Sequence, residues 1–233
     1  MYQIIVAAST HWDREWYRTF EDFRIRLCDL LNNLLDLLEQ DDDFFCYTFD
    51  GQSVVLEDYL EIFPHQKERL KRLVAQGKIV FGPLYNLPDE FLSSGEALIR
   101  NFLVGHQVCT AIGGKMNAGY IPDNFGHISQ MPQILNGVGL KSAFFFRGCN
   151  IDTLGGKEFI WKAPDGSKVL AEYMLLGYWS LKSWGKLGLS PEEHFKAAVT
   201  TLGAKSKLQT ILLINGSDHL YQDPEFTALL KKV

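Results

Sequence analysis

The sequence contains few cysteines and no long apolar run, and both features narrow the class of protein. No segment approaches the ~20 consecutive apolar residues that a membrane-spanning helix needs. The first apolar stretch, residues 2–8, lacks the length and the basic flank of a signal peptide. We therefore expect a cytoplasmic protein with no membrane partner. The cysteines are far apart and form no Cys-x-x-Cys pair, which predicts reduced core thiols and no disulfide framework; they are Cys28, Cys46, Cys109 and Cys149.

The chain also lacks a strong charge of either sign. Its formal net charge is -5 over 233 residues, and no stripe of lysine and arginine with interleaved aromatic residues occurs. This argues against nucleic acid as the main partner. Neither an internal repeat nor a low-complexity linker is present, and the length allows one large domain or two.

Strand and helix patterns alternate along the chain. Short apolar runs predict strands at 2–8, 44–49, 78–81, 116–121, 142–146 and 210–214, with helical spacing between them. One helix is expected to begin in a capping box of Ser93 and Glu96, and another at Ser190. Pro164-Asp165-Gly166 predicts a hairpin inserted at 159–172. This order predicts an α/β fold with a mainly parallel sheet, open or curled into a barrel.

Polar residues follow the ends of three predicted strands. His11 and Asp13 follow the first strand, Asp123 follows a middle one, and Asp218 follows the last. His11 and Asp13 can point the same way because side chains alternate along extended backbone. In a parallel sheet these ends share one edge, where such folds collect ligands. Imidazole and carboxylate together suit zinc or a similar divalent ion. The alternative is that each residue only pairs locally or caps a turn.

The same residues provide the groups for hydrolysis of a glycosidic bond. Asp123 can attack carbon, while Asp218 can give and take a proton. Trp12, Trp16 and Phe125 offer apolar faces on which a sugar ring can stack, although core packing is an equal alternative for each.

Several separate motifs, in order along the whole chain, carry a resemblance to a known family. They are His-Trp-Asp-Arg-Glu-Trp at 11–16, Phe-Asp-Gly-Gln at 49–52, Gly-Pro at 82–83 with Leu-Pro-Asp-Glu-Phe at 87–91, and Pro-Asp-Asn-Phe-Gly-His at 122–127. The chain resembles the amino-terminal catalytic domain of the family 38 glycoside hydrolases, which are zinc-dependent retaining α-mannosidases. It is most similar to their bacterial branch, often called mannosylglycerate hydrolases. The resemblance implies an irregular β/α barrel of the glycoside hydrolase and deacetylase type.

The resemblance also implies roles for individual residues. One zinc ion would be held by His11, Asp13 and Asp123. Asp123 would in addition be the nucleophile that forms a covalent mannosyl-enzyme, and Asp218 would be the acid/base. The implied substrate-binding residues are Trp16, Phe125 and Arg147. The substrate would be a mannoside or an oligosaccharide.

Two departures from the family pattern stand out. The family's remaining zinc ligand is a histidine in a His-Asp pair further downstream, and residues 1–233 include no such pair there. Because whole family members are several times longer, we expect residues 1–233 to be the amino-terminal α/β catalytic domain of a longer hydrolase, as a fragment or truncated chain. His127 and His219 are candidate substitute ligands, but a hydrogen-bonding or capping role is favoured for both. Leu84 stands where bacterial relatives commonly carry a tryptophan.

Other functions stay open on the sequence alone. A metal-dependent polysaccharide deacetylase also uses histidine and aspartate ligands at the strand ends of a β/α barrel. A carbohydrate-binding fragment without turnover is the alternative from another class. The sequence does not decide whether the leaving group is glycerate, another mannose or a phosphorylated derivative. It also leaves open whether the full-length protein forms oligomers.

Overall fold

The computed structural model describes residues 2–182, 189–222 and 224–233. Its strands are β1 (Gln3–Thr10), β2 (Tyr47–Phe49), β3 (Ile79–Phe81), β4 (Gly119–Ile121), β5 (Ser142–Phe145), β6 (Glu158–Lys162), β7 (Lys168–Tyr173) and β8 (Thr210–Asn215). The α-helices are α1 (Phe20–Gln40), α2 (Val54–Ile62), α3 (Lys67–Ala75), α4 (Gly95–Thr110), α5 (Met131–Gly137), α6 (Ile151–Leu154), α7 (Pro191–Gly203) and α8 (Phe226–Leu230). Two short 3₁₀ helices are η1 (Pro64–Gln66) and η2 (Gly177–Trp179). Among the described helices, none is long and apolar enough to cross a membrane.

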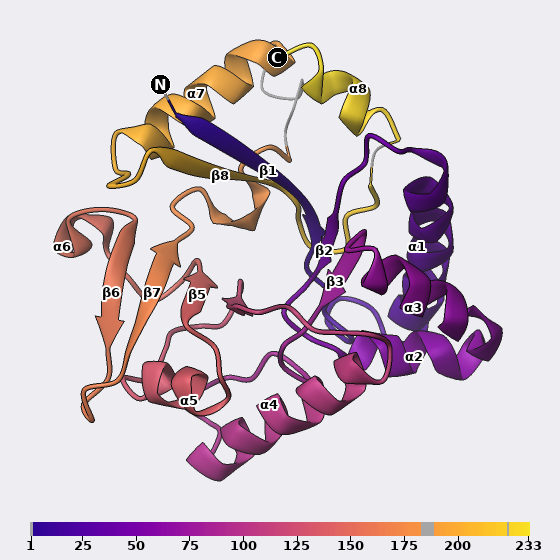
Figure 1. Cartoon of the computed structure of the whole chain (residues 1–233), viewed down its shortest axis with the longest axis horizontal. Helices are drawn as coiled ribbons and strands as arrows, with labels where there is room; N and C mark the ends of the chain where they lie inside the picture. The colour runs from indigo at the N-terminus through magenta and orange to yellow at the C-terminus, as the bar shows by residue number, and fades with distance from the viewer. Residues whose placement is uncertain (1, 183–188, 223) are drawn as a thin grey trace.

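The strands form two four-stranded sheets around a common centre, with the long helices outside them (Figure 1). The first sheet has the order β3-β2-β1-β8 and is parallel throughout. The second has the order β4-β5-β7-β6, in which only the β6–β7 pair is antiparallel. The predicted α/β fold with a mainly parallel sheet and an inserted hairpin is therefore confirmed.

The two sheets meet at glycines that allow two backbones to approach closely. A Cβ atom on Gly51, just after β2, would lie 1.9 Å from the carbonyl oxygen of Tyr120 in β4. A Cβ atom on Gly216, just after β8, would lie 2.6 Å from the carbonyl oxygen of Tyr178 in η2. Neither position has room for a side chain. The first contact lies between the two sheets, and the second joins the first sheet to the turn that follows β7.

The main core lies between the first sheet and helix α1. The helix presents one apolar face inward, as its 3.6-residue spacing predicts, and the buried residues of that face are Phe23, Leu27, Cys28, Leu30, Leu31, Leu34, Leu35 and Leu38. Burial of each large apolar side chain contributes about 1.5–3 kcal/mol, so this face anchors α1 firmly. The four cysteines are free; Cys28 and Cys109 are buried, as expected of core thiols, whereas Cys46 and Cys149 are half-buried.

Two local predictions needed adjustment. Helix α4 has Ser94 as its N-cap, which accepts a hydrogen bond from the Ala97 amide, so the capping box expected at Ser93 was wrong by one residue. Glu96 then stands one position too early to close such a box. The helix start expected at Ser190 is confirmed, and Ser190 forms a capping box with Glu193 through two hydrogen bonds. The strands expected at 44–49 and 116–121 are shorter than predicted, because only their last three residues pair with a neighbouring strand.

Candidate active site

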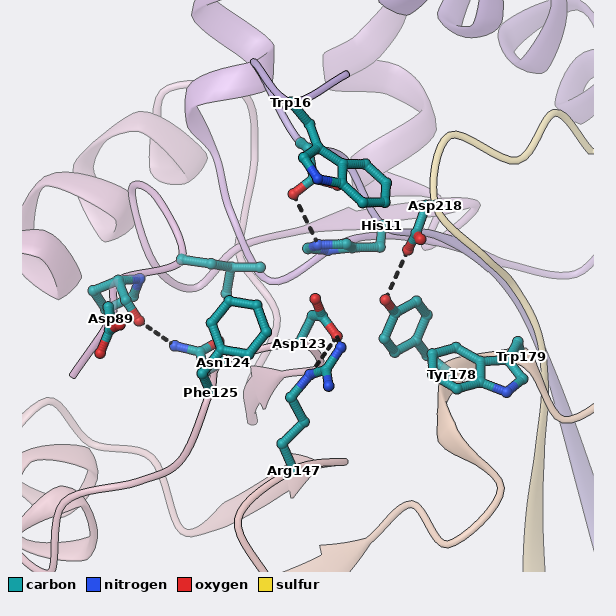
Figure 2. Close-up of a pocket in the computed structure, with 13 residues that line it drawn as sticks. His11, Trp16, Asp89, Asp123, Asn124, Phe125, Arg147, Tyr178, Trp179 and Asp218 are labelled. Carbon is teal, nitrogen blue, oxygen red and sulfur yellow. Dashed lines mark hydrogen bonds and ion pairs between the residues drawn. The ribbon is translucent and has the colours of Figure 1, made fainter. Parts of the chain in front are cut away.

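The carboxyl ends of the strands surround a pocket of about 640 Å³ (Figure 2). His11 and Asp13 reach it from the end of β1, Asp123 from the end of β4, and Asp218 from the end of β8. The pocket is lined by His11, Asp13, Trp16, Leu87, Pro88, Asp89, Asp123, Asn124, Phe125, Arg147, Tyr178, Trp179 and Asp218. Every residue to which the family resemblance gave a role is in this set, whereas Trp12 is not.

His11 is held in place by a buried carboxylate behind it. Its Nδ1 lies 3.1 Å from Oδ2 of Asp50, whose side chain is completely buried. Asp50 also accepts hydrogen bonds from the backbone amides of Trp12 and Gly51 and from the side chain of Gln52. Burial opposes a charge on His11, but the neighbouring Asp50 and Asp13 outweigh it and raise the pKa of His11 well above its ordinary value. Burial likewise opposes ionisation of Asp50, yet His11 and the other donors keep its pKa below the usual one.

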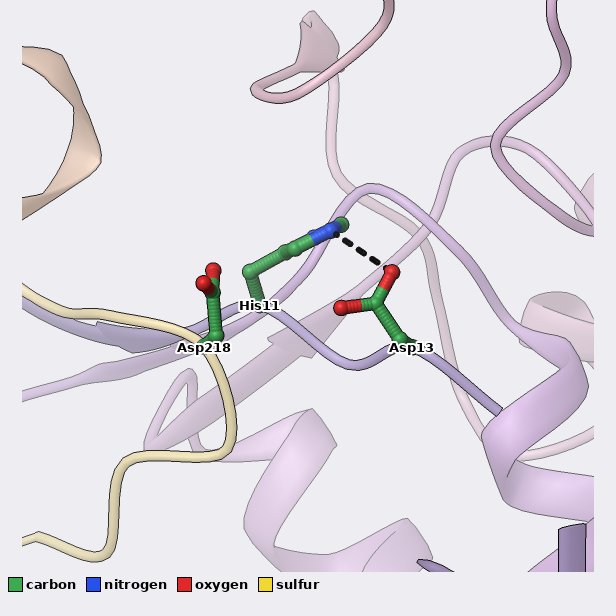
Figure 3. Close-up of side chains that lie close together, drawn as sticks. All are labelled: His11, Asp13 and Asp218. Atoms are coloured by element: carbon green, nitrogen blue, oxygen red, sulfur yellow. Dashed lines mark ion pairs between the residues drawn. The ribbon is translucent and has the colours of Figure 1, made fainter. Parts of the chain in front are cut away.

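With Nδ1 engaged by Asp50, the Nε2 atom of His11 faces Asp13 and the pocket. Nε2 lies 3.5 Å from Oδ1 of Asp13. One ligand atom from each of His11, Asp13 and Asp218 lies within 4.8 Å of the others (Figure 3). One imidazole nitrogen and two carboxylate oxygens form a donor set that fits zinc or a similar divalent cation. Among the described residues, the third member of this cluster is Asp218. Asp123 is not a member, although it lines the same pocket.

Asp123 forms an ion pair with Arg147. Oδ1 of Asp123 accepts a hydrogen bond from Nε of Arg147 over 2.8 Å and lies 2.7 Å from its Nη2. The guanidinium also lies 4.8 Å from the ring centre of Phe125 and 5.4 Å from that of Phe146. A cation held between two rings and a carboxylate is well fixed, so it orients Asp123.

Asp218 is bound by a tyrosine that the sequence analysis did not single out. The hydroxyl of Tyr178 donates a hydrogen bond to Oδ1 of Asp218 over 2.7 Å, and it also interacts with Asp123. Burial and these two carboxylates raise the pKa of Tyr178 above its ordinary value, so the phenol keeps its proton. One neutral donor therefore faces both carboxyl groups on which the predicted chemistry depends.

Comparison with known proteins identifies the family. The profile described as "Glycosyl hydrolases family 38 N-terminal domain" matches residues 1–233. The chain belongs to glycosyl hydrolase family 38. It is 34% identical to the protein named "Putative mannosylglycerate hydrolase" of Halalkalibacterium halodurans, over 97% of this chain and 27% of that protein. It is 30% identical to alpha-mannosidase 2C1 of Mus musculus, over 70% of this chain and 16% of that protein. The chain thus spans about a quarter or less of these relatives.

Solved structures support the family and the fold. An alpha-mannosidase from Enterococcus faecalis superposes with a TM-score of 0.93 at 32% identity, over 100% of this chain and 27% of that one. A polysaccharide deacetylase described from Mycobacterium smegmatis superposes with a TM-score of 0.60 at only 11% identity, so that likeness concerns the fold alone. The family 38 resemblance and the barrel of glycoside hydrolase and deacetylase type, both expected from the sequence, are confirmed.

The three aromatic residues that were candidates for stacking on a sugar ring have different environments. Trp16 is 63% exposed and lines the pocket, as does Phe125, which is 72% exposed. Trp12 is only 1% exposed and packs against Phe23 and His219, so the expectation that it could stack on a sugar was wrong. The physical reason is the alternation along β1: if His11 faces the pocket, its neighbour faces the core.

Neither substitute histidine ligand is available in this family 38 domain. His219 has a positive φ of 51°, stacks on Phe23 at 4.2 Å, and places Nε2 3.0 Å from the backbone oxygen of Asp13. His127 points away from the pocket, toward Glu90. The hydrogen-bonding roles favoured for both residues therefore agree with the structure.

Some pocket residues were outside the predicted site. On the sequence alone, Asp89 and Glu90 could either touch substrate or favour entry into the following helix; Asp89 lines the pocket, whereas Glu90 is buried and does not line it. For Trp179 and Trp184 the sequence favours packing over contact with the leaving group. Trp179 lines the pocket, and Trp184 lies outside the described residues. Leu84 is fully buried in the core of the second sheet, so it forms no part of the pocket wall.

Proposed function

We propose that the protein is a retaining α-mannosidase in which Asp123 is the nucleophile and Asp218 the acid/base. The observation that carries this proposal is that the single hydroxyl of Tyr178 faces both carboxyl groups. Two carboxyl groups that both lie next to one hydroxyl, which donates its hydrogen bond to Asp218, are close together. Retaining glycosidases have carboxyl groups about 5 Å apart, whereas inverting enzymes need a wider gap for water.

The residues of the pocket support a double displacement. Asp123 attacks the anomeric carbon and forms a new C–O bond while the bond to the leaving oxygen breaks. Asp218 gives its proton to that oxygen, so the leaving group departs as a neutral alcohol. Asp218 then takes a proton from water, whose oxygen attacks the same carbon and releases Asp123. Two inversions give net retention.

A divalent cation, which we propose to be zinc, fits beside this pair of carboxyl groups. His11 and Asp13 would hold it, with Asp123 as the ligand that the family resemblance implies and Asp218 near enough to contribute. When bound, such an ion supplies positive charge that grips sugar hydroxyls and favours a distorted ring. The residues themselves orient the sugar: Trp16 and Phe125 present exposed rings at the pocket, and Arg147 steadies Asp123.

We propose a mannoside as the substrate class, with mannosylglycerate or a phosphorylated derivative as candidates. The names of the relatives, mannosylglycerate hydrolase and alpha-mannosidase, support this choice. A cytoplasmic location and oligomerisation remain predictions from the sequence.

A metal-dependent deacetylase is the second candidate, because His11, Asp13 and Asp218 cluster at the strand ends of a fold shared with deacetylases. In that reaction water attacks an acetyl carbon, so no sugar becomes bonded to Asp123. Incubation of the full-length protein with a slowly released fluorinated α-mannoside, followed by peptide mass spectrometry, separates the two. We expect a fluoromannosyl group on Asp123 and none in Asp123→Asn. An active protein that releases mannose without labelling Asp123 would refute the proposed nucleophile.

The same protein preparations test whether residues 1–233 act alone. The isolated chain and the full-length protein are assayed with an aryl α-mannoside, with and without added Zn²⁺. Mannose binding without turnover by the shorter chain would assign it a carbohydrate-binding role only.

A further inference from the structure

We propose that Glu90 and His127 form a buried positioning pair that fixes the loop carrying Asp123. This inference rests on the proposed role of Asp123 as nucleophile. Neither residue lines the pocket, and neither touches the cation cluster. Their effect on the reaction would therefore be indirect, through the position of the loop that carries Asp123.

The pair joins the two loops that form one wall of the pocket. Oε1 of Glu90 lies 2.8 Å from Nδ1 of His127, and Oε2 accepts a hydrogen bond from the amide of Ile128 over 2.9 Å. Both oxygens of one carboxylate thus hold the segment just after Asp123. A third hydrogen bond also joins the two loops: the side-chain amide of Asn124 donates to the backbone oxygen of Pro88 over 2.5 Å (Figure 2).

His127 has little freedom to move. Its side chain is only 5% exposed and that of Glu90 is 0% exposed. The imidazole lies 4.6 Å from the ring of Phe145 and 5.7 Å from that of Trp161. Among the described residues the Nε2 atom of His127 has no hydrogen-bond partner, so the contact of Nδ1 with Glu90 is what orients the imidazole ring.

Two routes lead from the pair to Asp123. The first is the short chain segment from Asp123 through Asn124 to His127, which is anchored at both ends. The second runs through Gly148, where a Cβ atom would lie 3.0 Å from the Cα atom of Gly126 and 3.6 Å from the His127 ring. Gly148 follows Arg147, the partner of Asp123. A shift of His127 would therefore disturb both the backbone of Asp123 and the guanidinium that orients it.

Stability alone is a poor explanation for such a pair. Two polar side chains buried against each other often stabilise a protein no more than apolar side chains of the same volume, because desolvation offsets their attraction. A misplacement of about 1 Å at a reacting group, in contrast, can cost about 100-fold in rate. Fixing Asp123 is thus the larger effect that the pair can have.

The test compares full-length Glu90→Gln with the wild-type protein and with Glu172→Gln. Glu172 is a matched control, since it is another largely buried carboxylate with a basic partner, Lys157 at 2.9 Å, and does not line the pocket. The measurements are the rate of fluoromannosyl labelling of Asp123, kcat and KM with an aryl α-mannoside, and the melting temperature. For Glu90→Gln we expect labelling and kcat to fall by about 30- to 100-fold with KM changed less than about threefold. For Glu172→Gln we expect a lower melting temperature and kcat within about twofold.

A second pair of variants separates positioning from packing. His127→Asn keeps a donor near the Nδ1 position but loses the ring, whereas His127→Phe keeps the ring and loses the donor. We expect His127→Asn to recover a large part of the labelling rate that His127→Phe loses. Unchanged labelling in folded Glu90→Gln and His127→Phe, with only the melting temperature lowered as in Glu172→Gln, overturns the inference and leaves the proposed function intact. No labelling of Asp123 in the active wild-type protein overturns both.

Discussion

The phenol hydroxyl of Tyr178 donates to Asp218 over 2.7 Å and also faces Asp123, so one neutral donor connects the two proposed catalytic carboxyl groups. Tyr178 approaches them from η2, in a segment that packs against Gly216 just before Asp218. Its position thus depends on the close approach of the backbone of η2 to Gly216.

Replacing Tyr178 with phenylalanine should slow the reaction without unfolding the protein. A partly buried carboxyl group that loses its hydrogen-bond donor costs about 1–3 kcal/mol, which corresponds to roughly 5- to 150-fold in kcat/KM. The measurement is hydrolysis of an aryl α-mannoside by the full-length protein. Tyr173→Phe is the control, because Tyr173 lies in β7 and does not line the pocket. Equal rates for Tyr178→Phe and Tyr173→Phe would show that the hydroxyl has no part in the reaction.

Replacing His11 with asparagine should abolish cation binding selectively. Asparagine keeps a donor for Asp50 near the Nδ1 position but removes the Nε2 atom that faces Asp13. Loss of an outer partner of a ligand typically costs 10- to 100-fold in metal affinity, so loss of the ligand itself should cost at least about 100-fold. Zn²⁺ titration by calorimetry measures this, with His65→Asn, at an exposed position, as control. Retained affinity in His11→Asn would place the cation elsewhere.

Replacing Gly51 with alanine should separate the two sheets. The added Cβ atom would lie 1.9 Å from a backbone oxygen, which cannot move aside as a flexible side chain can. We expect a loss of about 3 kcal/mol or more in the free energy of unfolding, measured by urea denaturation. Gly137→Ala in α5 is the control, since its Cβ atom would meet nothing within 4 Å. Equal stability of the two variants would contradict the close contact between β2 and β4.

His106 should make the protein less stable as the pH falls. Burial, assisted by the charge of Lys115, lowers the pKa of His106 below its ordinary 6.5. Below pH 6.5 the unfolded chain therefore binds a proton that the folded state accepts only at lower pH, and the free energy of unfolding declines. His106→Phe should show a shallower decline between pH 7.5 and 5 in urea titrations. His65→Phe, at an exposed position, serves as the reference, and an identical decline in His106→Phe and wild type would exclude this contribution.

The charged residues of the site were predictable because simple rules govern them. Period-two alternation placed His11 and Asp13 on one face, and the shared edge of parallel strands brought Asp123 and Asp218 toward them. The same alternation shows why Trp12 had to face the core.

The contribution of Tyr178 was not predictable in this way. Its distance from Asp218 depends on a contact between segments 40 residues apart, in a 3₁₀ turn for which no periodic pattern exists. The burial of Glu90 beside Asp89 was equally hidden, because the loop that holds both has no regular alternation. The local sequence pattern therefore predicts where the strands end. Which loop residues face the pocket depends on tertiary packing, which no local pattern records.

The pairing of β1 with β8 has a consequence for biosynthesis. His11 forms an isolated bridge with Asp218, so the first and last strands must lie side by side before the pocket exists. A chain still emerging from the ribosome holds β1 with one edge unpaired until β8 has been made. The polar pocket should therefore form only after β8 has been made, and until then the unpaired edge of β1 is open to pairing with other strands.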